Sequence, residues 1–255
     1  MSVSQKVSTA VMAVGAVVLA VLVAVGATWA LPKDDPEPEP VESSTPVPTP
    51  PPTPSPAPPP PPPGPNEGKP PAGEGSFSVR GADGGELVSG AQYASMPYEL
   101  PLNPAGPQES MVRWVEGWGV PPERAEEGTV YVLGHAWAQA PLVFNPLSER
   151  VSADALGKPD EPVETLLYPV FRRSSDVLDG ARVEMVDGGG NRRVWEVDDA
   201  FLVDKEQAID DKALMDESVA GRVVLIACSV DGGEDLGFNV VAVSYTHLRA
   251  HETPE

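Results

Sequence analysis

The pattern of apolar and polar positions changes sharply along the 255-residue chain. Residues 8–31 are apolar and carry no charge, residues 32–74 are dominated by Pro, and bulky apolar residues return from Phe77 onward. The first run exceeds the roughly 20 residues that a helix needs to cross a bilayer core. The Pro-rich stretch cannot bury enough apolar surface to fold. We therefore expect a transmembrane helix at 8–31, a disordered spacer at 32–74 and a folded domain at 75–242.

Charges on either side of the apolar run predict its orientation. Lys6 precedes it, and an acidic stretch from Asp34 to Glu42 follows it. Positive charge favours the cytoplasmic side, so residues 1–7 are expected in the cytoplasm and the folded domain outside the cell, attached by a single membrane pass. The alternative is a cleaved signal peptide, because Thr28-Trp29-Ala30 has a small-x-small pattern. The run is longer than a signal-peptide core of about 7–15 residues, which favours a retained anchor.

The folded domain contains short apolar or alternating runs separated by glycine-rich turns. Turns are expected at 188–191 and 231–233, and short helices near Pro141 to Glu149 and near Gln207 to Met215. The expected strands are Thr129–Leu133, Arg182–Val186, Arg193–Val197, Val223–Ala227 and Asn239–Ala242. Many short strands with few helices indicate a mainly β fold that closes, or nearly closes, into a barrel.

Composition excludes several classes of function. The net charge of −21 argues against a nucleic-acid partner, which requires clustered basic residues. The single Cys excludes an internal disulfide and a thiolate metal cage. Acidic pairs at 198–199, 210–211 and 234–235 have ligand types suitable for Ca²⁺, but they lack EF-hand spacing and are expected to be solvated loops. We therefore expect no cofactor and no metal.

The end of the chain has a different character from the domain. Residues 243–253 read like the translation of a common transposon-type sequencing adapter, and the stretch from 243 to 255 contains two of the three His. The alternative is a natural polar tail after the last strand. We expect residues 243–255 to be a non-native tail and exclude them from the prediction of the fold.

Two residues outside that tail can carry nucleophilic chemistry. His135 follows the apolar run Val-Tyr-Val-Leu-Gly, and Cys228 follows Val-Val-Leu-Ile-Ala. Strand ends open onto a barrel rim, where side chains can meet a ligand. A thiol and an imidazole are the minimum for nucleophilic acyl transfer, in which Cys attacks as the thiolate and His protonates the leaving amine. The alternative for Cys228 is a small buried core residue.

The two runs resemble the motifs of the sortases. The segment from Thr129 to His135 resembles the sortase histidine motif, an apolar strand that ends in Gly-His. Leu225-Ile226-Ala227-Cys228 resembles the cysteine motif, which is usually Leu-x-Thr-Cys. Further positions are similar to actinobacterial sortases of classes E and F, namely Val112-Arg113-Trp114, Pro121-Pro122, Gly128, Phe144 and Leu147. The resemblance extends from about Phe77 to Ala242.

The resemblance implies an eight-stranded β-barrel and a transpeptidation reaction. Cys228 would attack a Thr–Gly-type bond in the C-terminal sorting signal of a secreted protein. An amine from a peptidoglycan precursor or a pilin lysine would then resolve the acyl-enzyme. His135 would act first as general acid and later as base.

The chain departs from the sortase pattern at two positions. Ala227 replaces the usual Thr, so a hydroxyl contact to substrate is lost. Sortases also use an Arg on the strand after the Cys, and none occurs between Cys228 and Ala242, where its expected place is near Gly237 and Phe238. Asn239 offers a neutral oxyanion donor, although a missing donor can cost about 10²–10³ in rate. The alternatives are therefore an impaired, sortase-like surface binding or scaffold protein, and a cysteine hydrolase.

Overall fold

The computed structural model describes residue 64 and residues 66–246. The predicted anchor at 8–31 and most of the predicted spacer lie outside this range. Of the predicted tail, only residues 243–246 fall within it. Among the described residues, no helix has the length and apolar character needed to span a membrane.

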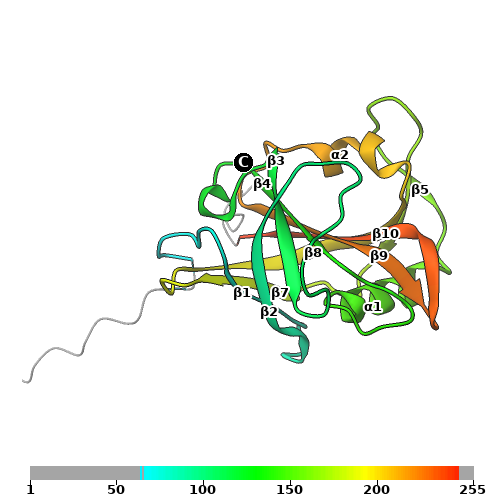
Figure 1. Ribbon diagram of the computed structural model, residues 1–255. Helices are drawn as coiled ribbons and strands as arrows, with labels where there is room; N and C mark the ends of the chain where they lie inside the picture. The colour runs from blue at the N-terminus through cyan, green and yellow to red at the C-terminus, as the bar shows by residue number, and fades with distance from the viewer. Residues whose placement is uncertain (1–63, 65, 247–255) are drawn as a thin grey trace, which may run out of the picture. The chain divides into compact units, whose positions relative to one another are not determined.

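Eight strands close into a barrel (Figure 1). The order round the ring is β10-β9-β4-β3-β2-β1-β7-β8, and β8 pairs back with β10. Neighbouring strands are antiparallel except for β2 with β3 and β4 with β9, which are parallel. The strand bounds are β1 Gly75–Arg80, β2 Glu86–Pro97, β3 Met111–Gly119, β4 Thr129–Gly134, β7 Arg182–Asp187, β8 Arg192–Asp204, β9 Arg222–Asp231 and β10 Glu234–Tyr245. Outside the ring, β6 (Phe171–Ser175) pairs with β8, and β5 (Glu161–Pro162) pairs with β6. The predicted mainly β, eight-stranded barrel is confirmed.

Each of the five predicted strands is present, and all five are longer than predicted. Strand β8 continues to Asp204 and β10 begins at Glu234, so the acidic pairs at 198–199 and 234–235 lie in strands, and the predicted loops there are wrong. Strand β10 continues past Ala242, because Val243 and Ser244 pair with both β8 and β9. The folded part therefore reaches Thr246, which is 4 % exposed. The origin of residues 243–255 stays a prediction.

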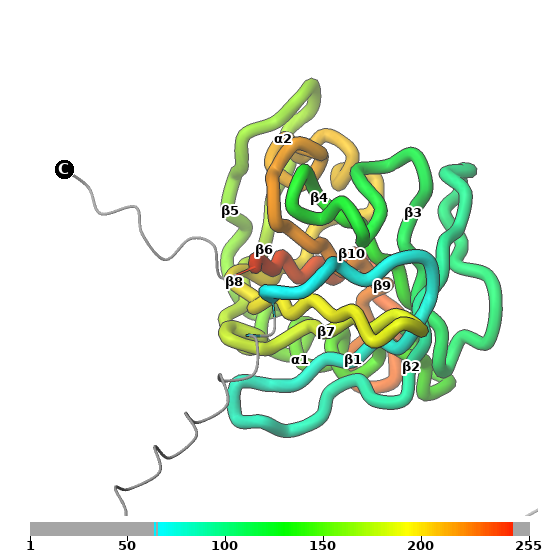
Figure 2. The backbone as a smooth tube through the Cα atoms, turned by 90° about the vertical axis from the view of Figure 1, so that its left-hand side faces the viewer, coloured from blue at the N-terminus to red at the C-terminus, as the bar shows by residue number. Residues whose placement is uncertain are grey.

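The helices are displaced or divided relative to the prediction. Helix α1 covers Asn145–Ala155, and Pro146 in its first turn fits a helix start, where the missing N–H needs no partner. The second predicted helix is divided at Asp211 into the 3₁₀ turn η2 (Ala208–Asp210) and helix α2 (Lys212–Met215). A further 3₁₀ turn, η1, covers Pro122–Arg124. Helices α1 and α2 lie on opposite sides of the barrel in both backbone views (Figures 1 and 2).

Alternation along the strands produces two apolar layers. Side chains such as Val132, Leu225 and Val240 belong to a core that draws on all eight barrel strands, together with Leu147 and Val151 of α1. Their sequence neighbours belong to an outer layer, formed by Tyr131, Leu133, Phe201, Val203, Val224, Val241 and Leu214 of α2. The strands β4, β8, β9 and β10 are thus apolar on both faces, and their outer face needs a cover.

A buried pair joins the first residues of β4 and β9. The Arg222 Nε donates to Thr129 Oγ1 at 2.9 Å, and Arg222 Nη1 donates to the Ala213 carbonyl of α2 at 2.7 Å. Thr129 is 0 % exposed and Arg222 is 3 % exposed. The carbonyl of Asp216 accepts from both Thr129 and Arg222. This Thr129–Arg222 clasp ties the two strands to the segment that covers their outer face.

Candidate functional site

An apolar groove lies on the outer face of the barrel. Its volume is about 490 Å³. One wall comes from the connection between β2 and β3, the other from residues 205–215, and the floor from the end of β4 and the middle of β9 and β10. Its lining residues are Tyr98, Leu100, Pro101, Leu102, Trp118, Leu133, Lys205, Ala208, Ile209, Leu214, Met215, Ile226, Cys228, Asn239 and Val241. The predicted nucleophile and the predicted oxyanion donor therefore lie in the same groove.

Cys228 of β9 and Asn239 of β10 are direct neighbours on adjacent strands. They are opposite residues in the antiparallel pairing of β9 with β10. The thiol of Cys228 is free and half-buried. Gly237 and Phe238, the places at which an Arg was expected, precede this position on β10. A donor on Asn239 is thus better placed to face the thiol than a side chain at either expected position.

The parallel pairing of β4 with β9 sets Leu133 level with Ile226, two positions before His135 and Cys228. The pairs run from Thr129↔Arg222 to Leu133↔Ile226 with a constant offset (222 − 129 = 93), and His135 and Cys228 differ by the same 93 positions. Leu133 and Ile226 both line the groove. His135 follows the end of β4 and is not among the residues that line the groove. Continued by two positions, the same register would set His135 level with Cys228, on strands about 4.8 Å apart.

The glycine before His135 has a steric role. A Cβ at Gly134 would lie 2.7 Å from Cγ of Phe144, whose ring is 1 % exposed and packs against Phe77. The Phe144 N–H donates to the His135 carbonyl at 2.9 Å. A glycine here lets the Phe144 ring approach the strand and hold the backbone of His135.

We expect Gly134→Ala to displace Phe144 and with it His135. Overpacking of this kind costs about 1–3 kcal/mol, which lowers the melting temperature by roughly 5 °C at about 2–4 °C per kcal/mol. Differential scanning calorimetry checks this result. The matched control is Gly237→Ala, because no described atom lies within 4 Å of a Cβ at Gly237. Equal melting temperatures for the two variants would contradict the steric role.

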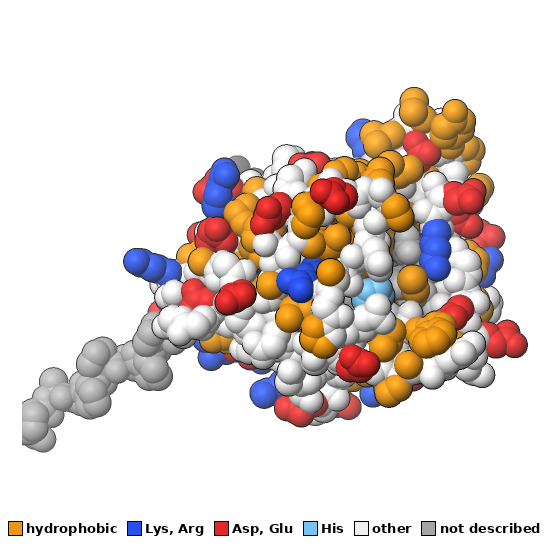
Figure 3. All heavy atoms as spheres, in the orientation of Figure 1, with side chains coloured by type: hydrophobic (Ala, Val, Ile, Leu, Met, Phe, Trp, Pro, Cys, Tyr) orange, Lys and Arg blue, Asp and Glu red, His pale blue; other side chains and the backbone are white. Residues whose placement is uncertain are grey.

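The imidazole of His135 is held by the loop that forms one groove wall. His135 Nε2 lies 2.8 Å from the Pro104 carbonyl. A carbonyl oxygen only accepts, so Nε2 carries the proton and Nδ1 is the acceptor when the ring is neutral. Arg113 fixes the same loop, because its Nε donates to the Ala105 carbonyl at 2.8 Å. The surface view shows the pale-blue histidine side chain at the surface beside apolar side chains (Figure 3).

Two serines hold the backbone around Cys228. Ser148 of α1 donates to the Cys228 carbonyl at 2.8 Å and accepts from the Val230 N–H at 2.9 Å. Ser229 donates to the Phe238 carbonyl at 2.8 Å, where the register of β9 with β10 shifts. Sequence reasoning missed Ser148. Its signal was a hydroxyl among the apolar residues of the buried face of α1.

Ala227 lies on the opposite face of β9. It is 6 % exposed and belongs to the barrel core, near Phe144 and Leu147. Its side chain therefore faces away from the groove. Of the two residues predicted to contact substrate, the structure brings Asn239 to the groove, while Ala227 packs inside the barrel.

The nearby arginines are occupied elsewhere, and none of the arginines in the described range lines the groove. Arg172 forms an ion pair with Asp211 at 2.6 Å and lies 3.8 Å from the centre of the Phe201 ring. Arg173 pairs with Asp160 at 2.7 Å. The cation in the groove lining is Lys205, which sequence reasoning also missed because it is one of two lysines in a polar segment.

Trp118, which lines the groove, forms an aromatic stack with the buried Tyr131 of β4. The rings of Trp118 and Tyr131 lie 3.9 Å apart and almost parallel. The Tyr131 hydroxyl donates to the Leu214 carbonyl at 2.7 Å. Burial raises the pKa of Tyr131 to about 12, so this hydroxyl stays protonated at neutral pH and keeps α2 in place over the floor.

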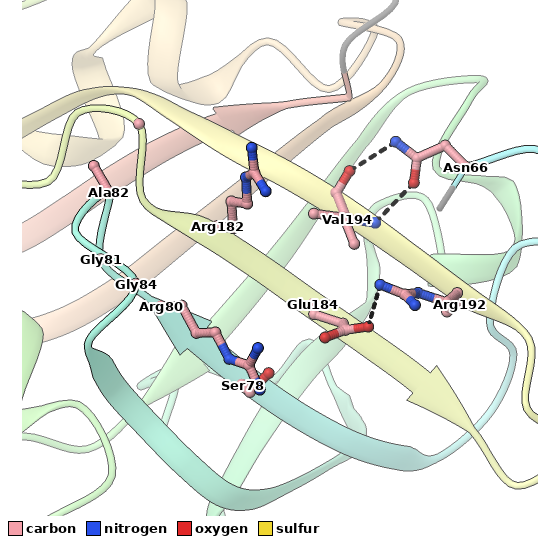
Figure 4. Close-up of a pocket in the computed structure, with 11 residues that line it drawn as sticks. Asn66, Ser78, Arg80, Gly81, Ala82, Gly84, Arg182, Glu184, Arg192 and Val194 are labelled. Atoms are coloured by element: carbon pink, nitrogen blue, oxygen red, sulfur yellow. Dashed lines mark hydrogen bonds and ion pairs between the residues drawn. The ribbon is translucent and has the colours of Figure 1, made fainter. Parts of the chain in front are cut away.

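A second cavity of about 460 Å³ lies over β1, β7 and β8. Figure 4 shows that Glu184 pairs with Arg192 there and that Asn66 bonds to the backbone of Val194. Its lining has no thiol and no imidazole. Within the described range, no three His, Cys, Asp or Glu side chains are grouped so as to hold a metal ion. The apolar groove is therefore the candidate site.

Solved structures similar to this chain include several sortases. Sortase A from Listeria monocytogenes is 10% identical over 68% of this chain and 86% of that chain, with a TM-score of 0.35. Sortase A from Corynebacterium diphtheriae is 13% identical over 71% and 63%, with a TM-score of 0.40. A Clostridium perfringens sortase D5 transpeptidase is 12% identical over 68% and 78%, with a TM-score of 0.36. No family model and no curated protein matches the chain. Similarity at this level does not define its family.

Proposed function

We propose that this protein is a cysteine transpeptidase of the sortase type, with Cys228 as the nucleophile and His135 as the general acid and base. One observation supports the proposal: Cys228 and Asn239 line an apolar groove, and the β4–β9 register, continued two positions beyond its last pair, would set His135 level with the thiol. Such a pair is the minimum for covalent acyl transfer.

The reaction would proceed in two steps. The Cys228 thiolate attacks a peptide carbonyl carbon, and the Asn239 amide donates to the oxyanion that develops. The C–N bond then breaks, and His135 gives a proton to the leaving amine, which leaves a thioester on Cys228. An incoming amine attacks the thioester, His135 takes its proton, and the thiolate departs. The product carries a new amide bond, and no net oxidation or reduction occurs.

The substrates proposed are secreted proteins with a C-terminal sorting signal. The acceptor would be an amine of a peptidoglycan precursor or of a pilin. The apolar walls of the groove suit an extended, aliphatic peptide segment. We place the domain outside the cell, attached to the membrane by residues 8–31 and raised by the Pro-rich spacer. At about 3.1 Å per residue, that spacer could reach roughly 100 Å.

Product analysis tests the proposal. The full chain in detergent is incubated with a peptide library, with and without glycyl or lysyl amines, and the products are identified by mass spectrometry. A transpeptidase should give amine-joined products together with a peptidyl adduct on Cys228. Peptide cleavage with no amine-joined product would overturn transfer and indicate a hydrolase.

A surface binding or scaffold protein is the second candidate. It is favoured by the groove lining, in which none of the described arginines is present to stabilise an oxyanion. In that case peptides should bind, while Cys228 forms no peptidyl adduct at any amine concentration.

A further inference from the structure

We infer that Lys205 selects substrates that carry a carboxylate, so that the groove accepts an aliphatic peptide segment with an acidic side chain near the reacting bond. This inference names the substrate class of the groove and rests on the proposed function. It starts from the position of Lys205, its lack of a partner and the apolar character of the remaining lining.

Lys205 lies on the same face as Cys228 and Asn239. It directly follows β8, and its N–H donates to the Gly237 carbonyl at 3.3 Å. Phe201 and Val203, four and two positions earlier, belong to the outer apolar layer, so the period of two places Lys205 on that face. Strand β10 separates β8 from β9, so Lys205 lies about 10 Å to one side of Cys228. Its long, flexible side chain can direct the ammonium into the space beside Asn239.

The ammonium of Lys205 makes no ion pair or hydrogen bond with any residue in the described range. Lys158 and Lys212, in contrast, pair with Asp154 and Glu164. The carboxylate next to Lys205 is engaged elsewhere, because Asp204 accepts the backbone N–H of Glu206 at 2.8 Å. The chain has 38 acidic residues and 17 basic ones, so an unpaired lysine is not explained by a shortage of carboxylates.

The rest of the groove lining indicates which kind of ligand the Lys205 ammonium would bind. Apart from Lys205, the groove presents aliphatic and aromatic side chains, the Cys228 thiol and the neutral Asn239 amide. Hydrogen bonds to charged groups are stronger than neutral ones, and more so where apolar walls limit the access of water. An anion seated between Lys205 and Asn239 would receive both a charged and a neutral donor, while an aliphatic segment covers the apolar walls.

Binding of matched peptides tests the inference without relying on turnover. Fluorescently labelled nine-residue peptides with an aliphatic centre, and one position set to Asp, Glu, Asn or Gln, are titrated against the full chain carrying Cys228→Ala. We expect the acidic member of each pair to bind about tenfold more tightly. Lys205→Met should remove this preference, Lys205→Arg should keep it, and Lys205→Glu should reverse it toward peptides with Lys at that position.

The matched control is Lys212→Glu, which changes charge by the same amount on neighbouring α2 but outside the groove lining. It should keep the preference for acidic peptides. Equal binding of acidic and amide peptides, or no binding of either, overturns the inference. If acidic peptides bind preferentially but the wild-type chain forms no peptidyl adduct, the inference stands and the proposed transpeptidation fails.

Discussion

Cys228→Ala is expected to abolish peptide cleavage and amine transfer, and His135→Ala to slow both by about 10²–10⁴-fold, the usual contribution of general acid–base catalysis. The first change removes the nucleophile. The second keeps the thiol but removes the group that protonates the leaving amine. Rates are measured by separating labelled peptide products, and alkylation of the single Cys by iodoacetamide confirms that the thiol of the His135 variant remains accessible.

Two controls separate chemistry from folding. Cys228 is half-buried, and within the described range its sulfur takes part in no hydrogen bond, so Cys228→Ala should melt within about 2 °C of wild type. His251→Ala, in the predicted non-native tail, should leave turnover unchanged. Cleavage that persists in Cys228→Ala would refute the assignment of the nucleophile.

Asp211→Ala should cause the largest loss of stability. Asp211 is 0 % exposed, and its two carboxylate oxygens accept from Nε and Nη2 of Arg172, each at 2.6 Å. It also caps α2 by accepting from the Leu214 N–H at 3.0 Å. Without Asp211, Arg172 keeps only the longer ion pair with Asp199, at 3.6 Å, among the described residues, and breaking a buried pair costs about 3–5 kcal/mol. The melting temperature should fall by roughly 10 °C, at about 2–4 °C per kcal/mol.

The adjacent carboxylate provides the control for this result. Asp210 makes no side-chain ion pair with any described residue, although its backbone carbonyl accepts from the Leu166 N–H. Asp210→Ala should therefore melt within about 2 °C of wild type. Because Asp211 anchors the segment that forms one groove wall, Asp211→Ala should also weaken peptide binding at temperatures at which the barrel is still folded. Equal melting temperatures for Asp211→Ala and Asp210→Ala would contradict the expected contribution of the Arg172–Asp211 pair to stability.

The barrel was predictable because its signal is local. A period of two on either side of a glycine turn identifies β7 and β8, and a short continuous apolar run identifies β9. Pairing is not local. Nothing in the apolar run before His135 indicates that β4 lies parallel to β9, about ninety residues away. The ends of strands are also weak signals, and so β10 continues past the predicted boundary at Ala242.

Residue chemistry was enough to propose Cys228 and His135 as a catalytic pair, whereas the residues around them were not predicted. The sortase resemblance placed the missing Arg near Gly237 and Phe238, but the register shifts between Asp235 and Asn239, and Asn239 pairs with Cys228. Lys205 and Pro104 belong to connections between strands, where sequence patterns carry little information about which side chain meets a groove. Their roles depend on tertiary contacts alone.

The Thr129–Arg222 clasp fixes the starting point from which positions along β4 and β9 are counted. From Thr129 to His135 and from Arg222 to Cys228 the count is the same six residues, or about 20 Å of extended strand. Lengthening the chain between the two strands leaves both counts unchanged, whereas deleting one residue within either count would turn His135 or Cys228 toward the barrel interior. A search for chains with the same site should therefore specify Thr-x₅-His and Arg-x₅-Cys and leave the distance between them open.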